Sequence, residues 1–212
     1  MIKKPDELIR DGLVELGLIP SKEQINAFMV YLSELKKWNK AYNLTGLRKD
    51  EDIIIKHFLD SLLYLKAIPD GKIKVTDVGS GAGVPGIPIK IIRPEIEMYL
   101  IEPSRKKTAF LRHIIKQLGL KKIEVIEKRI EEIQESGFSV DVAVTRALFN
   151  IKDFVKKASP VVREGGYFIL SKGPKVKEEL SKIKIKRIKD ITIFELSLPL
   201  VNTKRFIVMI EK

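Results

Sequence analysis

The stretch Val75–Lys90 reads VTDVGSGAGVPGIPIK and decides the fold. A β-branched run ends in Asp77, a loop rich in glycine follows, and an apolar segment of helical length comes next. Glycine permits tight turns and close backbone approach, and the first turn of a helix offers free N–H groups. A strand, a glycine loop and a helix in this order hold nucleotide-like cofactors at the carboxyl ends of α/β sheet strands. We therefore expect a cofactor site here.

Downstream of this stretch, strand and helix patterns alternate. Strands are expected at 73–78, 96–101, 123–126, 140–145, 167–170, 185–196 and 206–210, and helices from the glycine loop to Arg93 and at 104–118, 131–135, 151–158 and 175–181. Such alternation predicts a mostly parallel sheet with helices on both faces. The last two strands have no evident helix between them, which predicts an antiparallel hairpin at the edge of the sheet.

The N-terminal third has helical periodicity instead. Ser21 and Gln24 form a capping box that opens a helix, and a second helical stretch runs from 50 to about 65. Pro69-Asp70-Gly71 is a turn signal and the best boundary. We therefore expect a helical extension at 1–70 and a cofactor-binding domain at 71–212.

Composition narrows the class of protein. Forty basic residues against 28 acidic ones give a net charge of +12, which favours a polyanionic partner such as nucleic acid, although a Lys-, Ile- and Glu-rich chain adapted to heat shows the same bias. The absence of cysteine excludes disulfides, thiolate metal sites and cysteine nucleophiles. No apolar run approaches the ~20 residues of a membrane span. We expect a cytoplasmic protein with no membrane partner and no metal.

The glycine loop fits two cofactor patterns. Gly81–Gly86 matches the dinucleotide pattern G-x-G-x-x-G, whereas Gly79–Gly83, preceded by Asp77, matches the loop of S-adenosylmethionine enzymes. Glu102 ends the next strand, where a carboxylate accepts the ribose hydroxyls of either cofactor. The loop and Glu102 alone therefore leave both cofactors open.

Three features favour S-adenosylmethionine. The Asp77 carboxylate suits the cationic amino-acid end of that cofactor, and a dinucleotide has no need of it. Pro85 and Pro88 make the helix start rigid. The closing strand pair resembles the hairpin end of class I methyltransferases. In that fold the loop after the third strand, here Ile130-Glu131, borders the adenine, although Glu131 equally suits the first turn of a surface helix.

The segment Val144–Asn150, after the fourth strand, reads VTRALFN and narrows the reaction. It lacks the Asn/Asp-Pro-Pro-aromatic motif that serves exocyclic amines, and without cysteine the chain cannot form the covalent adduct needed to methylate a pyrimidine carbon. An endocyclic nitrogen such as guanine N7 needs only in-line positioning. Arg146 would position the base, a phosphate or the cofactor, or form an ion pair at the strand end.

Four motifs carry a more specific resemblance: WNKAYNLTG at 38–46, HFLDSLL at 57–63, DVGSGAGVPGIPIKI at 77–91 and VTRA at 144–147. With them the chain resembles the bacterial small-subunit rRNA guanine-N7 methyltransferases, the glucose-inhibited division protein B family. The resemblance covers nearly the whole chain. It implies a class I fold with an N-terminal helical extension, S-adenosylmethionine as the cofactor, and 7-methylguanosine in 16S rRNA as the product.

The resemblance also implies site residues. By it Gly79, Val84, Ile130, Glu131 and Arg146 contact the cofactor, and we add Gly81, Glu102 and Ser104 from the loop and the strand end. The segment Glu102-Pro103-Ser104 departs from the Asp-Ser that is more frequent in the family, but the carboxylate is kept.

The residues predicted to contact the substrate are polar or basic. His57, Asp60 and Ser61 share one helix face, an arrangement more typical of helix packing than of catalysis. We name Arg146, Asn43 and Asp60 as candidates for positioning the target. The predicted RNA contacts are His57 and the basic run Arg105, Lys106 and Lys107, preferred over the basic segment 172–189, which also suits a solvated edge strand.

The target base itself is constrained by RNA geometry. Guanine N7 lies in the major groove, which is deep and narrow in A-form RNA, so the target guanine should be unpaired or extruded. The expected partner is 16S rRNA or a small-subunit precursor, and nothing in the sequence requires more than a monomer. The alternatives are methylation of another RNA or of a protein, and a cofactor-sensing RNA-binding module without catalysis.

Overall fold

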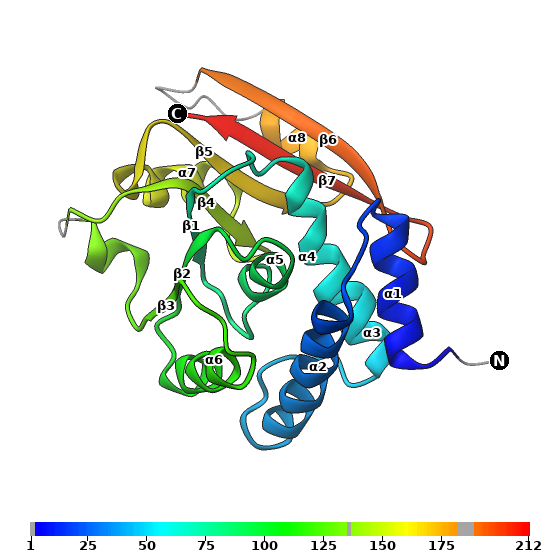
Figure 1. The fold of residues 1–212 in the computed structure, drawn as a ribbon. Helices are drawn as coiled ribbons and strands as arrows, with labels where there is room; N and C mark the ends of the chain where they lie inside the picture. The colour runs from blue at the N-terminus through cyan, green and yellow to red at the C-terminus, as the bar shows by residue number, and fades with distance from the viewer. Residues whose placement is uncertain (1–2, 135–136, 182–188) are drawn as a thin grey trace.

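The computed structural model describes residues 3–134, 137–181 and 189–212. Its strands form one sheet in the order β3-β2-β1-β4-β5-β7-β6, in which β7 runs antiparallel to both neighbours and the other pairs are parallel (Figure 1). The strands are β1 Lys74–Val78, β2 Glu97–Ile101, β3 Ile123–Ile126, β4 Val140–Arg146, β5 Val162–Lys172, β6 Asp190–Leu198 and β7 Thr203–Glu211. The order reverses between β1 and β4, which is where α/β sheets bind ligands.

Helices cover both faces of this sheet because each buries one apolar stripe. They are α5 Gly86–Ile92, α6 Arg105–Gln117, α7 Ile151–Ala158 and α8 Val176–Ser181, with 3-10 turns η3 Ile130–Ile133 and η4 Ser159–Val161. One buried cluster joins α5 and α6 to one face of the sheet, and a second joins η3 and α7 to the other. Phe110 of α6 and Phe154 of α7 are fully buried in the respective clusters.

The N-terminal helices extend the first of these layers. They are α1 Pro5–Glu15, α2 Lys22–Tyr42, α3 Asp50–Ile53, η1 Ile54–Leu59, α4 Asp60–Leu62 and η2 Leu63–Lys66. Helix α2 lies against α5 and α6, as Figure 1 shows, and Phe28, Tyr31 and Leu35 of α2 belong to the same buried cluster as α5 and α6. The extension thus has no core of its own separate from the sheet layer. Among the described residues, no helix is long and apolar enough to cross a membrane.

Most predicted elements are confirmed within a few residues, including the mostly parallel sheet and the antiparallel hairpin at its edge. Strand β5 is much longer than the predicted 167–170, because the chain passes through Gly165 and Gly166 with a register shift against β4 and continues as a strand. The helix predicted at 131–135 is the 3-10 turn η3 at 130–133, and residue 135 lies outside the described residues. The strand predicted at 185–196 begins at Asp190, and 185–188 also lie outside them.

One irregularity lies within the long helical stretch at 50–66. The segment η1 is a π-helix, whose wider turns are frequent at functional sites. It contains Lys56 and His57, and the backbone carbonyls of both accept hydrogen bonds from a side chain at the end of β4, as described below. Apolar periodicity predicts the helix but not this local widening.

Candidate active site

The glycine loop leaves β1 in a conformation that glycine alone adopts easily. Gly79 and Gly81 have φ values of +76° and +57°, in the left-handed region. The Gly79 and Ser80 amides donate to the Ile101 carbonyl at 2.8 and 3.1 Å, which ties the loop to the end of β2. From α2, the buried Tyr31 hydroxyl donates to the Ala82 carbonyl at 2.5 Å. The loop is therefore held from both the sheet and the N-terminal extension.

Asp77, on β1, is fully buried beneath this loop. Its Oδ2 accepts from the Gly86 amide at the start of α5, at 2.9 Å, while its Oδ1 has no hydrogen-bond partner among the described residues. Burial raises the pKa of the Asp77 carboxyl to about 7, and the Gly86 hydrogen bond limits that rise. A buried polar atom without a partner is rare in folded proteins.

Glu102 follows β2, and its carboxylate contacts the glycine loop that follows β1. Its Oε2 accepts from the Gly81 amide at 2.9 Å and its Oε1 from the Ser104 amide at 3.0 Å, and the residue is 5% exposed. Each carboxylate oxygen can accept a second hydrogen bond. The predicted residues Gly81, Glu102 and Ser104 are thus brought together, with a carboxylate oriented by the backbone.

A cavity of about 270 Å³ opens beside the loop at the carboxyl ends of β1 and β2. It is lined by Val78, Gly79, Ile101, Pro103, Lys128, Arg129, Ile130, Glu131, Leu148, Phe149 and Lys157. The predicted residues Gly79, Ile130 and Glu131 therefore share one cavity. The Glu131 carboxylate forms an ion pair with Lys157 of α7, and this hydrogen bond lowers the Glu131 pKa.

The cavity and its surroundings fit S-adenosylmethionine. The apolar cavity suits the adenine, and the oriented Glu102 carboxylate beside the loop suits the ribose hydroxyls. A Cβ added at Gly79 would collide with the Leu148 side chain, so the backbone is approached closely at this point. Val84, at the far end of the loop, is partly exposed and is joined to Pro85 by a cis peptide bond.

Arg146, at the end of β4, lies at the centre of a second polar cluster. Its guanidinium donates to the Lys56 carbonyl at 2.6 Å and to His57 Nδ1 at 3.1 Å. It also pairs with the Asp60 carboxylate at 3.4 Å, and the same carboxylate accepts from Arg205 Nε of β7 at 2.8 Å. Asp60 is 4% exposed, so two guanidiniums share one buried carboxylate. Arg146 and Asp60, predicted as positioning residues, and His57, predicted as an RNA contact, are thereby brought together.

His57 connects this cluster to the loop after α2. His57 Nδ1 lies 3.1 Å from the Arg146 guanidinium and 3.2 Å from the Lys56 carbonyl, and Nε2 lies 2.7 Å from Thr45 Oγ1. Burial lowers the His57 pKa to about 4, and the charge of Arg146 adds to this effect. The Asn39 side chain in turn holds the Thr45 backbone through two hydrogen bonds of 2.9 Å.

Other predicted residues lie apart from that cluster. Asn43 is exposed at the C-terminal end of α2, has a φ of +50°, and accepts from Arg48. Arg105 and Lys106 are exposed at the first turn of α6, directly after Ser104, and Lys107 is partly buried. In the alternative basic segment, Lys172 donates to the Phe149 carbonyl and pairs with Glu179, while 182–188 lie outside the described residues.

Comparison with known proteins identifies the family. The family model described as rRNA small subunit methyltransferase G matches residues 24–208. The chain belongs to the rRNA small subunit methyltransferase G family. The chain is also 37% identical to the ribosomal RNA small subunit methyltransferase G of Neisseria meningitidis serogroup B over 209 residues, which cover 97% of this chain and 98% of that protein.

Comparison with solved structures shows that this chain has the fold of class I methyltransferases. A predicted O-methyltransferase from Agrobacterium tumefaciens matches with a TM-score of 0.55 and 21% identity, over 72% of this chain and 78% of that one. Coclaurine N-methyltransferase bound to N-methylheliamine and SAH matches with a TM-score of 0.51 and 20% identity, over 78% and 56%. At these identities the likeness concerns the fold alone.

Membership of the rRNA small subunit methyltransferase G family confirms several expectations: the resemblance, the class I fold, the methyltransferase activity on small-subunit rRNA and S-adenosylmethionine as the cofactor. The dinucleotide alternative is thereby excluded. Among the described residues, no group of three or more His, Cys, Asp or Glu side chains could hold a metal ion.

Sequence reasoning missed three residues of this site. Arg205 of the last strand completes the Asp60 ion pairs, and no sequence signal distinguishes it from its neighbour Lys204. Tyr64, fully buried, donates to the Thr145 carbonyl at 2.6 Å and accepts from the Ser171 amide at 3.0 Å, which fixes the end of β4. Leu148 is 54% exposed although it lies over Gly79.

Proposed function

We propose that this member of the rRNA small subunit methyltransferase G family transfers the methyl group of S-adenosylmethionine to N7 of a single guanine in 16S rRNA. The cofactor supplies an electrophilic methyl group on a sulfonium. Guanine N7 carries a free in-plane lone pair, so no proton has to leave before transfer. The protein then has to bring the two atoms into line and keep them there.

The observation that carries this proposal is that the polar groups around Arg146 are already engaged in ion pairs and hydrogen bonds. The Asp60 carboxylate is committed to two guanidiniums, and the His57 ring accepts from Arg146 through Nδ1. Neither group is therefore placed as a free general base. This arrangement suits a nucleophile that needs positioning and no deprotonation.

We assign the residues as follows. The cofactor is held by Gly79, Gly81, Val84, Glu102, Ser104, Ile130 and Glu131. Arg146 lies between the cofactor and the target guanine, and Asp60 and Asn43 orient the target. The RNA is contacted by His57, Arg105, Lys106 and Lys107. In this division residues 71–212 bind the cofactor, and residues 1–70 complete the substrate side. Nothing in this mechanism needs a metal or a second subunit, so we propose a monomer that acts in the cytoplasm on 16S rRNA or a small-subunit precursor.

The test is methyl transfer from labelled S-adenosylmethionine to small-subunit rRNA prepared from cells that lack this enzyme. Nuclease digestion and mass spectrometry then identify the product. We expect one 7-methylguanosine per 16S rRNA. A different methylated nucleoside, or a label that stays out of the RNA, would overturn the proposal. Naked rRNA and assembled subunits, compared side by side, show which of the two is the substrate.

A further inference from the structure

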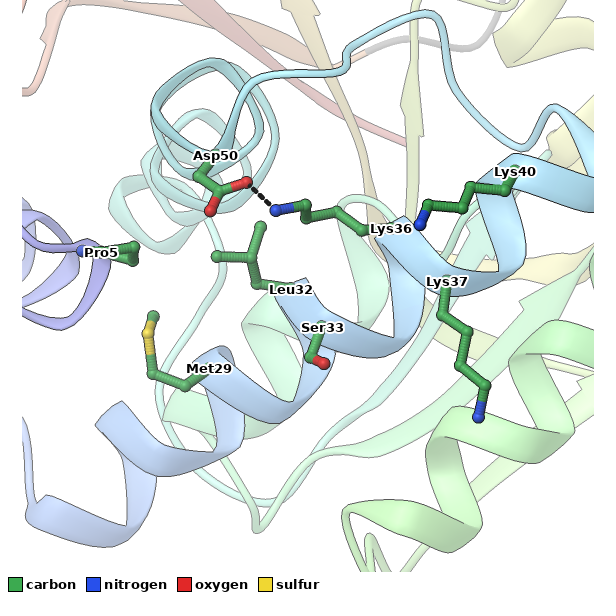
Figure 2. Close-up of a pocket in the computed structure, with 8 residues that line it drawn as sticks. All are labelled: Pro5, Met29, Leu32, Ser33, Lys36, Lys37, Lys40 and Asp50. Carbon is green, nitrogen blue, oxygen red and sulfur yellow. Dashed lines mark ion pairs between the residues drawn. The ribbon is translucent and has the colours of Figure 1, made fainter.

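A groove lies on the N-terminal extension, on the outer side of α2. We call it the lysine groove, and it is lined by Pro5 of α1, by Met29, Leu32, Ser33, Lys36, Lys37 and Lys40 of α2, and by Asp50 of α3. Its volume is about 430 Å³, larger than that of the cavity beside the glycine loop. Figure 2 shows the aliphatic side chains at one end of the groove and the lysines toward the other.

The groove combines an apolar floor with a cationic rim. Leu32 is buried and Met29 is half-buried, so the floor is part of the packed surface of α2. Lys40 is exposed, and Lys36, 42% exposed, pairs with Asp50 at 2.5 Å across the groove. In Figure 2 the Lys40 side chain extends back toward Lys36.

The charges in this groove do not balance. Its lining carries three lysines and one carboxylate. Lys36 pairs with Asp50 and Lys37 pairs with Glu34 outside the lining, so Lys40 is the lysine of this groove without an ion-pair partner among the described residues. Lys36 and Lys40 are four residues apart on one helix, a spacing at which like charges destabilise the helix by about 0.2–0.5 kcal/mol. Asp50 offsets this repulsion at Lys36, and an anion beside Lys40 would offset it further.

The groove is connected to the Arg146 cluster through the end of α2. Lys40 follows Asn39, whose side chain holds the Thr45 backbone. Thr45 contacts His57, and His57 contacts Arg146. These contacts place the Lys40 end of the groove next to the loop that supports His57.

We propose that the lysine groove is a docking site for an unpaired segment of the substrate RNA. Lys36 and Lys40 contact its phosphates, and one base or ribose packs on Met29 and Leu32. Lysine ammonium groups are mobile point charges that suit a phosphate backbone, and an apolar floor suits the flat face of a base. This inference rests on the proposed function in taking RNA as the substrate, but it concerns RNA binding and not the methylated atom.

The test uses the double variant Lys36→Gln/Lys40→Gln in the full-length protein, with small-subunit rRNA transcribed in vitro as the probe. Each lost phosphate contact lowers the slope of log Kd against log salt concentration by about 0.7 on a single strand. We expect the slope to fall by about 1.4, the Kd for RNA to rise about tenfold, and the Kd for S-adenosylmethionine to stay the same.

Two further variants make the test specific. Lys116→Gln/Lys121→Gln removes two exposed lysines near the C-terminal end of α6, at the opposite end of the strands from the cofactor cavity, and should leave the RNA Kd within twofold of wild type. Met29→Ala probes the floor, and it should weaken RNA binding without changing the salt slope.

The outcomes separate the two proposals. If Lys36→Gln/Lys40→Gln binds RNA with the wild-type Kd and salt slope, or if the α6 control loses as much affinity, the docking site is wrong. If wild-type protein forms no 7-methylguanosine while the groove variant still loses RNA affinity as expected, the docking site stands and the proposed reaction fails.

Discussion

The variant Asp77→Asn tests how ionisation of the buried carboxyl under the cofactor loop changes the stability of the folded protein. The folded-state pKa of about 7 lies above the ordinary value of 3.8, so the folded protein binds more protons than the unfolded chain between these two values. Stability contributed by the protonated carboxyl is therefore lost as pH rises through this window. The difference between the two pKa values corresponds to about 4 kcal/mol of unfolding free energy, which is lost in full above pH 7.

Asparagine imitates the protonated carboxyl and cannot ionise. Relative to wild type, the free energy of unfolding of Asp77→Asn should therefore rise by about 1.4 kcal/mol per pH unit from about pH 4 and level off above pH 7. The lowered pKa of His57 gives stability the opposite pH dependence, but it acts in both proteins and cancels in the difference.

The assay is urea unfolding of both proteins without cofactor at pH 5, 6, 7 and 8, followed by circular dichroism. Asp190→Asn, at an exposed position on β6, controls for the change of residue type. A constant difference between Asp77→Asn and wild type across this range would refute the reasoning. So would a variant that is less stable than wild type at pH 8.

Three other outcomes are expected. Asp60→Asn leaves two guanidiniums without their shared carboxylate and should cost about 3 kcal/mol of unfolding free energy, measured in urea; a loss below 0.5 kcal/mol would contradict the ion-pair geometry. Gly79→Ala places a Cβ against Leu148 at a positive φ, which should lower the free energy of unfolding by about 1 kcal/mol. It should also weaken S-adenosylmethionine binding more than tenfold, measured by calorimetry. Wild-type affinity would argue against this cofactor placement. His57 should titrate near pH 4 by NMR, because burial disfavours its charged form, and a midpoint near 6.5 would show that the ring is solvated.

The cofactor half of the site could be predicted because its signals are local. Gly79, Gly81 and Glu102 lie at strand ends that the sequence pattern places on one edge of the sheet. In the structure the Gly79 amide donates to the Ile101 carbonyl and the Gly81 amide to the Glu102 carboxylate. The long strand β5 was harder, because Gly165 and Gly166 suggest a turn where the sheet only shifts register. Local composition does not show how a neighbouring strand accommodates a bulge.

The sequence by itself determined the mostly parallel sheet with its edge hairpin, the glycine loop and, through the resemblance of four motifs, the family and its class I fold. Each of these follows from periodicity or from motifs of adjacent residues. Only the tertiary structure decided which groups meet Arg146. Asp60 and Arg205 are 145 residues apart and come together because the helical extension packs against the end of the sheet where β4 and β7 present their arginines. Such pairing depends on the packing of whole elements, which no local pattern encodes.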